Sequence, residues 1–327
     1  MSGFRWGILG TGGIAQAFVN DLKHAPGHSV GAVGSRTLSK ATAFAKNISG
    51  ATAHGSYQNL VDDSSLDAIY VATPHPMHLE HTLLAVNAGK PTLCEKPFAI
   101  SATQSQLMVD AAARNNVALL EAMWTRYLPH IAQLREILRS GVLGVIQTVE
   151  ADHGQRLADQ NIARLTDLEL GGGALLDLGI YPVSFTHLIL GAPSAITARA
   201  VKTDRGVDAQ TSAIFDYASG AQAVINTTMI AQTPCRAVVS GYLGRLEIDR
   251  TFYTPTAMRV VLFDGSTTEY SSTYVGHGLR EQAIEMARVV RAGLLQSPLM
   301  PWSETIAVMK TMDEIRRQIA LKYPFES

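Results

Sequence analysis

The chain has 327 residues, of which 46% are hydrophobic and 17% charged, and its formal net charge is −1 at pH 7. This length predicts about two domains, and the apolar content excludes a disordered chain. The lack of a basic surplus disfavours nucleic-acid binding. Two cysteines cannot form a disulfide framework and fit a reducing compartment. No signal-peptide pattern is present and no apolar run approaches the roughly 18 residues of a membrane helix, so we expect a cytoplasmic protein without a membrane partner.

The first third of the chain alternates short apolar runs with amphipathic helical patterns. Apolar runs without strict alternation, each followed by a helix, are typical of buried parallel strands in βαβ units. We therefore predict a doubly wound parallel sheet over residues 1–121. The strands are expected at Trp6–Leu9, Ser29–Val33, Ala68–Ala72, Thr92–Cys94 and Val117–Leu120, and the helices at Ala15–Leu22, Leu38–Lys46, Leu79–Ala88 and Ser101–Arg114.

The pattern changes near Glu121, and we assign residues 122–327 to a second domain. Its successive β-like segments have no helices between them, which favours antiparallel pairing. We predict an α+β domain with a large, open, mostly antiparallel sheet. Its strands are expected at Val145–Glu150, Ala195–Ala200, Thr211–Tyr217, Ala221–Thr228, Ala237–Ser240, Leu246–Ile248 and Val260–Phe263, and its helices at Pro129–Leu138, Ala174–Leu190, around Leu279–Leu294 and between Ser303 and Pro324.

A glycine-rich turn follows the first predicted strand. Its sequence, Gly10-Thr11-Gly12-Gly13-Ile14-Ala15, fits the dinucleotide fingerprint G-x-G-x-x-G/A. Gly10 permits the tight turn, Gly12 lets the backbone approach a pyrophosphate, and Ala15 allows close packing of helix on strand. The helix N-terminus then offers free N–H groups to the phosphates. The strand before it and the helix after it make this motif specific, and we predict a bound dinucleotide.

The end of the second strand indicates which dinucleotide binds. An NAD enzyme usually places Asp or Glu there for the ribose hydroxyls. This chain has Gly34-Ser35-Arg36, with Lys40 following and no carboxylate available. A hydroxyl and two cations suit a 2′-phosphate. We therefore predict NADP(H) as the cofactor, with NAD(H) the less favoured alternative.

The fifth predicted strand ends in Cys94-Glu95-Lys96-Pro97. In open α/β sheets the ligand crevice lies at the carboxyl ends of the strands, and a lysine there can act as an acid or base. From the residues alone, a surface lysine would fit equally well.

Together these motifs resemble the glucose–fructose oxidoreductase/inositol dehydrogenase (Gfo/Idh/MocA) family, and within it the dihydrodiol dehydrogenase and NADP-dependent D-xylose dehydrogenase branch. The resemblance covers the whole chain. It is carried by the fingerprint, Val71-Ala72-Thr73-Pro74-His75-Pro76-Met77-His78, Ala88-Gly89-Lys90, Glu95-Lys96-Pro97, Glu121-Ala122-Met123-Trp124-Thr125-Arg126, Gly171-Gly172-Gly173-Ala174-Leu175-Leu176-Asp177-Leu178-Gly179-Ile180-Tyr181 and Ser297-Pro298-Leu299-Met300-Pro301.

The resemblance implies an active site around Lys96, with a Lys96–Pro97 bond that is often cis in the family. Many relatives carry Asp-x-x-x-His on a helix of the second domain, whereas this chain has Asp177 and Tyr181. The tyrosine matches the dihydrodiol dehydrogenase branch, where it is assigned as the acid/base. Residues spaced i, i+4 share a helix face, so both side chains can reach one site. A lysine ammonium beside a tyrosine lowers the pKa of the phenol from about 10, which favours Tyr181 as the base. Lys96 as the base is the open alternative.

The predicted site residues fall into two groups. Lys96, Tyr181 and Asp177 are the catalytic candidates, with Asp177 orienting a substrate hydroxyl. His75, His78 and His81 lack zinc-site spacing, so no metal is expected. His153 ends a strand and is expected to be structural or at the rim of the site. The cofactor-binding candidates are Gly10, Gly12, Gly13, Ile14, Ser35, Arg36, Lys40, Thr73, Pro74, His75, His78, Glu95, Lys96, Trp124 and Arg126.

These observations predict an NADP-dependent oxidoreductase. The reaction would transfer a hydride between a secondary alcohol of a sugar, polyol or cyclic trans-diol and the nicotinamide. Two alternatives remain: an NADPH-dependent sugar-ketone reductase of the anhydrofructose reductase type, and a dinucleotide-binding sensor without turnover. The resemblance also implies a homodimer formed through the open sheet.

Overall fold

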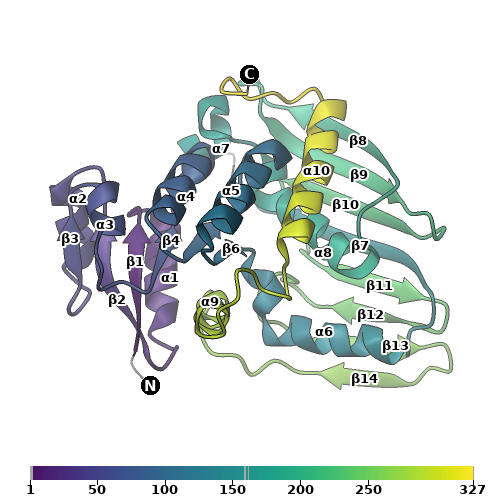
Figure 1. Cartoon of the computed structure of the whole chain (residues 1–327). Helices are drawn as coiled ribbons and strands as arrows, with labels where there is room; N and C mark the ends of the chain where they lie inside the picture. Colours follow the sequence, from purple (N-terminus) through teal and green to yellow (C-terminus); the bar gives the residue numbers. More distant parts are fainter. Residues whose placement is uncertain (1–2, 158–159, 161, 327) are drawn as a thin grey trace. The chain divides into compact units, whose positions relative to one another are not determined.

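The computed structural model describes residues 3–157, 160 and 162–326, and the chain divides into two compact units (Figure 1). The first unit comprises Met1–Tyr127 and Gly276–Ile306, and the second comprises Leu128–Val275 and Ala307–Ser327. This grouping differs from a single division after residue 121. The physical reason is Asp21, whose buried carboxylate accepts the backbone N–H groups of His277 (2.6 Å), Gly278 (2.9 Å) and Arg280 (2.8 Å) and so holds the late segment against the first helix.

The first unit contains the predicted doubly wound sheet. Six parallel strands lie in the order β3-β2-β1-β4-β5-β6. All residues of β4, β5 and β6 are buried and most are apolar, as expected for strands covered on both faces. The strands are β1 (Phe4–Leu9), β2 (His28–Gly34), β3 (Thr52–His54), β4 (Ala68–Val71), β5 (Thr92–Glu95) and β6 (Leu119–Ala122).

Helices cover both faces of this sheet. On one face, a core cluster joins the sheet to α3, α4 and α5. On the other face, Phe18 of α1 stacks on Tyr70 of β4 with ring centroids 4.0 Å apart and meets Trp6 of β1 at 5.4 Å. The helices are α1 (Gly13–Leu22), α2 (Leu38–Ala45), α3 (Tyr57–Val61), α4 (His78–Asn87), α5 (Ala102–Asn115) and α9 (Arg280–Arg291).

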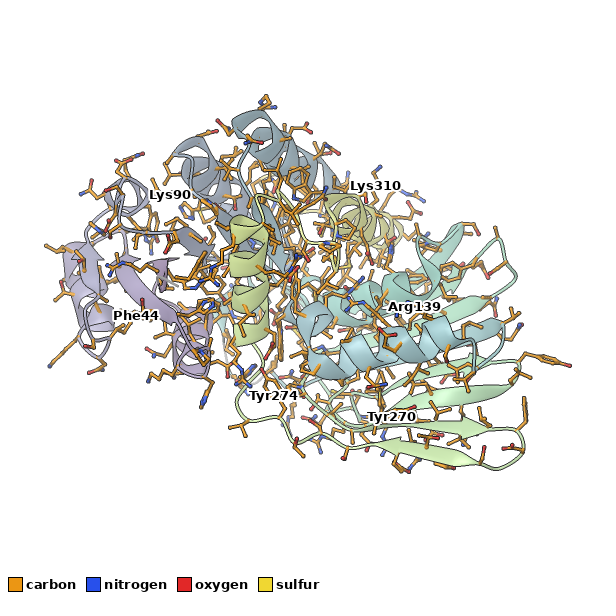
Figure 2. The ribbon with its side chains drawn as sticks, turned by 60° about the horizontal axis from the view of Figure 1, so that its bottom comes forward. Phe44, Lys90, Arg139, Tyr270, Tyr274 and Lys310 are labelled. Carbon is orange, nitrogen blue, oxygen red and sulfur yellow. The ribbon has the colours of Figure 1, made fainter. Side chains whose placement is uncertain are left out.

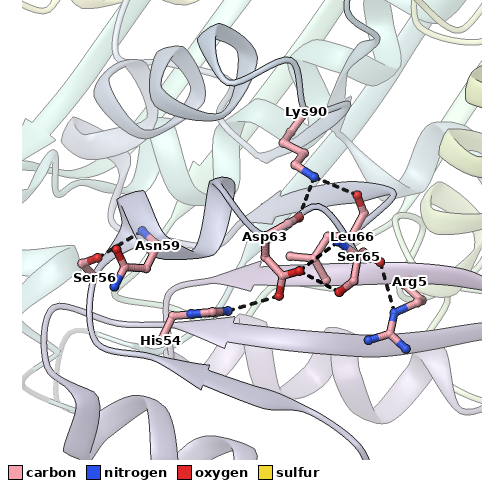
Figure 3. A network of polar contacts seen from close by, with 8 residues as sticks. All are labelled: Arg5, His54, Ser56, Asn59, Asp63, Ser65, Leu66 and Lys90. Atoms are coloured by element: carbon pink, nitrogen blue, oxygen red, sulfur yellow. Dashed lines mark hydrogen bonds and ion pairs between the residues drawn. The ribbon is translucent and has the colours of Figure 1, made fainter.

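A polar network fixes the segment between α3 and β4 (Figure 3). The ammonium of Lys90 donates to the carbonyl oxygens of Asp63 (2.6 Å) and Leu66 (3.1 Å). The Asp63 carboxylate accepts the hydroxyl of Ser65 at 2.7 Å and the ring Nε2–H of His54 at 3.2 Å. The Ala88-Gly89-Lys90 motif of the sequence therefore supports the fold, because its lysine satisfies backbone carbonyls of the first unit.

The second unit contains the predicted open sheet. Eight strands lie in the order β14-β13-β12-β11-β7-β10-β9-β8, and only the β7–β10 pair is parallel. Figure 1 shows α6, α8 and α10 on one face of it. The strands are β7 (Ile146–Gly154), β8 (Ala195–Lys202), β9 (Asp208–Asp216), β10 (Gln222–Thr228), β11 (Ala237–Gly241), β12 (Gly244–Ile248), β13 (Met258–Leu262) and β14 (Thr267–Tyr270).

The helices of this unit begin and end at recognisable residues. Helix α6 (Pro129–Ser140) starts with proline and stops at Gly141, whose φ of 72° suits glycine. The others are α7 (Ala163–Thr166), α8 (Ile180–Leu190) and α10 (Trp302–Gln318), whose first turn belongs to the first unit. In Figure 2, Arg139 of α6 and Tyr270 of β14 mark the second unit, and Phe44 and Lys90 the first.

One helical stretch, Leu168–Leu190, is long and apolar enough by length and composition to cross a membrane, with a mean hydropathy of 1.4. Glu169, Asp177 and His187 interrupt its apolar residues, so it contains no long uninterrupted apolar run. Of its most apolar 18-residue window, 83% is buried inside the protein, which is also the pattern of a core helix.

Candidate active site

The glycine-rich turn has the geometry of a phosphate-binding loop. Gly10 has a φ of +109°, and a Cβ there would lie 2.8 Å from the carbonyl oxygen of Ala72. Gly12 is the N-cap of α1 and, having no side chain, leaves the first N–H groups of the helix uncapped. Gly12 and Gly13 are exposed, and Ile14 is half-buried in the first turn. These free N–H groups and the positive helix end form an anion site.

The carboxyl end of β2 carries cations and no acid. Ser35 is buried, and its N–H donates to the carbonyl of His54 at 3.1 Å. Arg36 and Lys40 are both exposed, one after the strand and the other in the first turn of α2. Burial raises the pKa of Tyr57, and the Arg36 guanidinium opposes that shift, so the cation lies close to this ring. These residues fit a 2′-phosphate better than a ribose diol.

The loop after β4 is held by histidines. The hydroxyl of Thr73 lies 3.0 Å from Nδ1 of His81. The ring of His78 lies between two carbonyl oxygens, with Nε2 2.9 Å from that of Thr73 and Nδ1 2.9 Å from that of Pro97. Burial lowers the pKa of His78 to about 4, so the ring is neutral and donates to one carbonyl at a time. His78 thus ties this loop to the Glu-Lys-Pro segment, and its predicted role toward the cofactor stays a prediction.

Pro74 and His75 continue this loop into a short 3₁₀ turn, His75–Met77. The ring of His75 is half-buried and meets that of His78 edge-on at 5.6 Å. Both residues directly follow the carboxyl end of a central strand, the edge at which open α/β sheets bind ligands.

Lys96 follows the carboxyl end of β5, as predicted. The peptide bond between Lys96 and Pro97 is cis. The preceding Glu95 is buried; its carboxylate accepts the hydroxyl of Tyr70 and, at 3.1 Å, the backbone N–H of Lys96. The glutamate therefore anchors the segment that presents the lysine, and its predicted contact with the cofactor stays a prediction.

Trp124 and Arg126 follow β6 and are both buried. The Trp124 ring packs against His277, with centroids 4.9 Å apart. The Arg126 guanidinium pairs with the carboxylate of Glu304 at 2.5 Å. Packing and this ion pair account for both positions, and their assignment to the cofactor site stays a prediction.

In the second unit, Asp177 lies in a π-helical turn, Leu175–Gly179, that runs directly into α8. Such turns are rare and are frequent at functional sites. The Asp177 carboxylate pairs with Arg164 at 3.0 Å and is largely buried, whereas the arginine is half-exposed. Asp177 and Tyr181 thus belong to one continuous helical segment. Its first turn is π-helical, whereas the i, i+4 spacing predicted an α-helix throughout.

Tyr181 is buried among aromatic rings. Its ring meets His153 at 5.2 Å and Tyr253 at 4.8 Å, and the latter two stack on each other at 4.0 Å. Tyr253 was not among the predicted site residues, and His153 was expected to be structural or at the rim of the site. The only signal for either was its position at or beyond the end of a predicted strand.

Gln155 connects two of these rings. Its amide nitrogen donates to Nε2 of His153 at 2.9 Å and to the hydroxyl of Tyr253 at 3.0 Å. Nδ1 of His153 lies 3.1 Å from the carbonyl oxygen of Leu178 and so carries the ring proton. With Nε2 accepting from the amide, the imidazole is neutral and fixed in one tautomer. Tyr181 therefore lies in a cluster that offers flat apolar surface and hydrogen-bonding groups together.

The predicted site residues are divided between the two units. The phosphate loop, the cationic end of β2, the histidine loop and Lys96 follow the carboxyl ends of neighbouring strands in the first unit. Asp177 and Tyr181 belong to the second. Among the residues that the structure describes, no group of three or more His, Cys, Asp or Glu side chains could hold a metal ion.

Comparison with known proteins agrees with this division. Residues 4–123 match the model of an oxidoreductase family with an NAD-binding Rossmann fold, and residues 131–247 match that of the GFO/IDH/MocA C-terminal domain. The chain is 34% identical to a trans-1,2-dihydrobenzene-1,2-diol dehydrogenase of Xenopus tropicalis, over 98% of this chain and 99% of the relative. It is 35% identical to a D-xylose 1-dehydrogenase (NADP⁺) of Hypocrea jecorina, over 98% of this chain and 93% of the relative.

Solved structures show the same architecture. A 3-ketoreductase from Actinomadura kijaniata in complex with NADP and TDP-benzene superposes with a TM-score of 0.86 at 26% identity, covering 97% of this chain and 98% of that protein. An aldose-aldose oxidoreductase from Caulobacter crescentus, at 24% identity and with the same coverage, has a TM-score of 0.87 and shows the shared fold. The resemblance expected from the motifs is confirmed, and the chain belongs to the Gfo/Idh/MocA oxidoreductase family.

Proposed function

We propose that this protein is an NADP-linked dehydrogenase that oxidises a secondary alcohol of a polyhydroxylated substrate, a sugar or a cyclic trans-diol. The observation that carries the proposal is the setting of Tyr181: a tyrosine buried among polar aromatic rings, one helical turn after a carboxylate. The relatives that match over nearly the whole chain are named as dehydrogenases of a trans-diol and of D-xylose, which are both compounds with adjacent hydroxyl groups.

The residues of the first unit fit NADP. A Cβ at Gly10 would collide with backbone, and Gly12 leaves the start of α1 bare, so the loop can take a pyrophosphate. Ser35, Arg36 and Lys40 would hold the 2′-phosphate, with no carboxylate at the end of β2 to repel it. Thr73 and His75 follow β4, which pairs with β1 on the side away from β2, where the nicotinamide half would lie.

Bound NADP⁺ supplies the hydride acceptor. Oxidation also requires removal of the hydroxyl proton as the hydride leaves the same carbon, and Tyr181 is the base that takes this proton. We propose Lys96 as the group that binds the same hydroxyl, since an ammonium near a phenol favours its phenolate form. Lys96 as the base is the second assignment, and the two groups can titrate as one unit.

Asp177 and the aromatic cluster would orient the substrate. The Asp177 carboxylate would accept a hydrogen bond from a neighbouring hydroxyl, and the ion pair with Arg164 holds it in place. The half-buried ring of Tyr253, which is backed by His153, would offer flat surface to the C–H side of a sugar or diol ring. The Gln155 amide nitrogen donates to both His153 and Tyr253 and so would keep this surface in one arrangement when the substrate binds.

We also propose a cytoplasmic homodimer that forms through the uncovered face of the large sheet. Ile214 and Val224 are cross-strand partners on β9 and β10 and are 43% and 45% exposed, which is unusual for paired apolar residues in mid-sheet. Sedimentation should give twice the chain mass for the wild type and the chain mass for Ile214→Arg. A wild-type monomer would contradict this part of the proposal. We expect no nucleic-acid or membrane partner.

A dehydrogenase screen tests the activity. The purified protein should reduce NADP⁺ with at least one member of a panel of pentoses, hexoses, inositols and trans-dihydrodiols. NADPH-dependent reduction of a sugar ketone without measurable oxidation would favour the anhydrofructose reductase alternative. Tight NADPH binding without turnover in either direction on the whole panel would favour a sensor and contradict the proposal.

A further inference from the structure

The helical segment that carries Asp177 and Tyr181 begins against a buried carboxylate from another part of the chain. Asp208 is the first residue of β9 and has no exposed surface. Its Oδ2 accepts the backbone N–H of Leu175 at 2.8 Å and the hydroxyl of Thr211 at 2.8 Å. Ala174, the N-cap of the π-helical turn, has no polar side chain, so Asp208 supplies the cap across 33 residues of sequence.

Of the two glycines directly before this segment, Gly173 is explained by that carboxylate and Gly172 by neighbouring backbone. Gly173 has a φ of +122°, and a Cβ there would lie 2.1 Å from Oδ1 of Asp208. A Cβ at Gly172 would lie 2.7 Å from the carbonyl oxygen of Leu165, and the Gly172 carbonyl accepts the hydroxyl of Tyr323 at 2.9 Å. Bare backbone is therefore required here for the aspartate to reach the start of the helix.

The carboxylate lies at the positive end of the helical segment, where a negative charge is favourable. Its second oxygen, Oδ1, is buried and has no hydrogen-bond partner among the described residues. Burial raises the pKa of Asp208 to about 7, and the hydrogen bonds from Thr211 and Leu175 limit that rise. Its ionised form is thus stabilised first by the hydroxyl of Thr211 and then by the helix start, and burial shifts its pKa toward the range in which the enzyme would be assayed.

Few other charges face this group. Lys202, at the end of β8, favours the ionised form. Tyr323, near the C-terminus, is close enough for the carboxylate to raise the pKa of its phenol further, beyond the effect of burial. On the helical segment the nearest ionisable residue in sequence is Asp177, which is paired with Arg164.

We propose that Asp208 is a positioning residue, whose ionised carboxylate holds the first turn of this segment and through it the side chains of Asp177 and Tyr181. The inference rests on the proposed function only in that Tyr181 is the group whose placement turnover requires. A charged acceptor holds a backbone N–H more strongly than a neutral one. Protonation of Asp208 therefore loosens the turn, and ionisation tightens it.

The experiment combines hydrogen exchange with kinetics on the full chain. In the wild type, the peptide over residues 173–182 should be better protected at pH 8 than at pH 6, after correction for intrinsic exchange rates. Asp208→Asn keeps the shape and an acceptor oxygen but removes the charge. Its peptide should show the lower protection at both pH values. Its kcat at pH 8 should fall about tenfold, because a neutral acceptor holds the Leu175 N–H less strongly than a charged one, with an unchanged Kd for NADPH.

Asp216→Asn is the matched control, because it makes the same change at the other end of β9, where the side chain accepts only Gln222 within the sheet. It should behave as the wild type in both measurements. Wild-type protection that is equal at pH 6 and pH 8 would overturn the inference without any variant. Wild-type protection and kcat in Asp208→Asn would overturn it as well. A wild type without turnover on any substrate would count against the proposed function, while the exchange data would still decide the role of Asp208.

Discussion

His153 stacks on Tyr253 with ring centroids 4.0 Å apart and presents its edge to Tyr181 at 5.2 Å. Its two nitrogens are already used, one toward the carbonyl of Leu178 and the other by the amide of Gln155. A histidine held in this way forms a wall of the site and has no free nitrogen with which to take a substrate proton.

The first prediction concerns this wall. His153→Phe keeps an aromatic ring beside Tyr181 but leaves the Gln155 amide without its acceptor. We expect the free energy of unfolding to fall by about 1–3 kcal/mol, the cost of an unsatisfied buried polar group, and KM for the substrate to rise because Gln155 no longer holds Tyr253 against a fixed ring. The pH dependence of kcat should keep the limb that belongs to the base. Urea unfolding measures the stability, and steady-state kinetics from pH 6 to pH 10 measure KM and the pH dependence. Disappearance of that limb would make His153 itself the base.

The second prediction separates binding from folding within the phosphate loop. Gly12 has φ −81° and ψ 179°, which any residue adopts, and the nearest atom to an added Cβ is 4.0 Å away. Gly12→Val should therefore fold normally and lose NADPH binding, because its side chain occupies the place of the pyrophosphate. Gly10→Ala should instead lower the melting temperature, because its Cβ meets the Ala72 carbonyl at 2.8 Å. Normal NADPH titration of Gly12→Val would show that the loop does not bind the phosphates.

The third prediction tests the choice between the two cofactors. Arg36→Ala should weaken NADP⁺ binding by about 1.5–3 kcal/mol, the range for hydrogen bonds to charged groups, and leave NAD⁺ binding unchanged. Lys46→Ala, which removes an exposed cation at the far end of α2, is the control and should change neither. Fluorescence titration with NADPH and NADH provides the measurement. Equal affinity of the wild type for both nucleotides would refute the preference.

The fourth prediction concerns stability. Glu121 is buried at the end of β6, and although Oε2 accepts the hydroxyl of Thr305 at 2.9 Å, burial raises the pKa of its carboxyl from 4.5 to about 7. Between these values the folded protein binds more protons than the unfolded chain, so the stability contributed by this group is present below pH 4.5 and lost as the pH rises to 7. The Glu121→Gln variant has no carboxyl at this position and therefore does not lose stability in this way. From pH 5 to pH 8 it should gain up to about 3 kcal/mol relative to the wild type.

Urea unfolding at both pH values measures this difference. Glu80→Gln, at an exposed position of α4, is the control and should follow the wild type at both. A stability difference between Glu121→Gln and the wild type that does not change with pH would show that the carboxyl is ionised throughout this range.

The parallel sheet was predictable because its central strands are buried on both faces and appear in the sequence as continuous apolar runs. The two strands that the sequence analysis omitted lie at sheet edges. β3 is Thr-Ala-His and β14 is Thr-Thr-Glu-Tyr, and neither contains an apolar run. Edge strands pair through backbone hydrogen bonds with little burial of side chains, so composition carries almost no signal for them.

The site residues also divide into those that could be predicted from the sequence and those that could not. The phosphate loop and Lys96 are marked by local motifs, since each depends on a strand ending in a particular turn. Asp208 forms a hydrogen bond with Leu175, 33 positions away in the sequence, and Tyr253 forms one with Gln155, 98 positions away. No local sequence pattern connects the members of either pair. The Gly171-Gly172-Gly173 run was visible in the sequence. The sequence did not show that Gly173 leaves space for the carboxylate of Asp208.

The fifth prediction concerns the lysine. Lys96→Met removes the ammonium and keeps an unbranched side chain of similar length. Turnover should fall at least about 10²-fold, the low end for general acid–base catalysis, with NADPH affinity retained. The double variant with Tyr181→Phe should be little worse than either single variant, because groups that act as a unit are not additive. Multiplied losses in the double variant would show that the two residues serve separate steps.

The most direct test of the central claim is the pH profile of kcat for Tyr181→Phe in the oxidation direction. The substitution removes the hydroxyl and keeps the ring among its neighbours. We predict turnover at least about 10²-fold below the wild type, unchanged affinity for NADPH, and loss of the rising limb that reports ionisation of the base. Near-native turnover with the wild-type profile would contradict the account, and would make Tyr181 a packing residue and Lys96 or His75 the leading base.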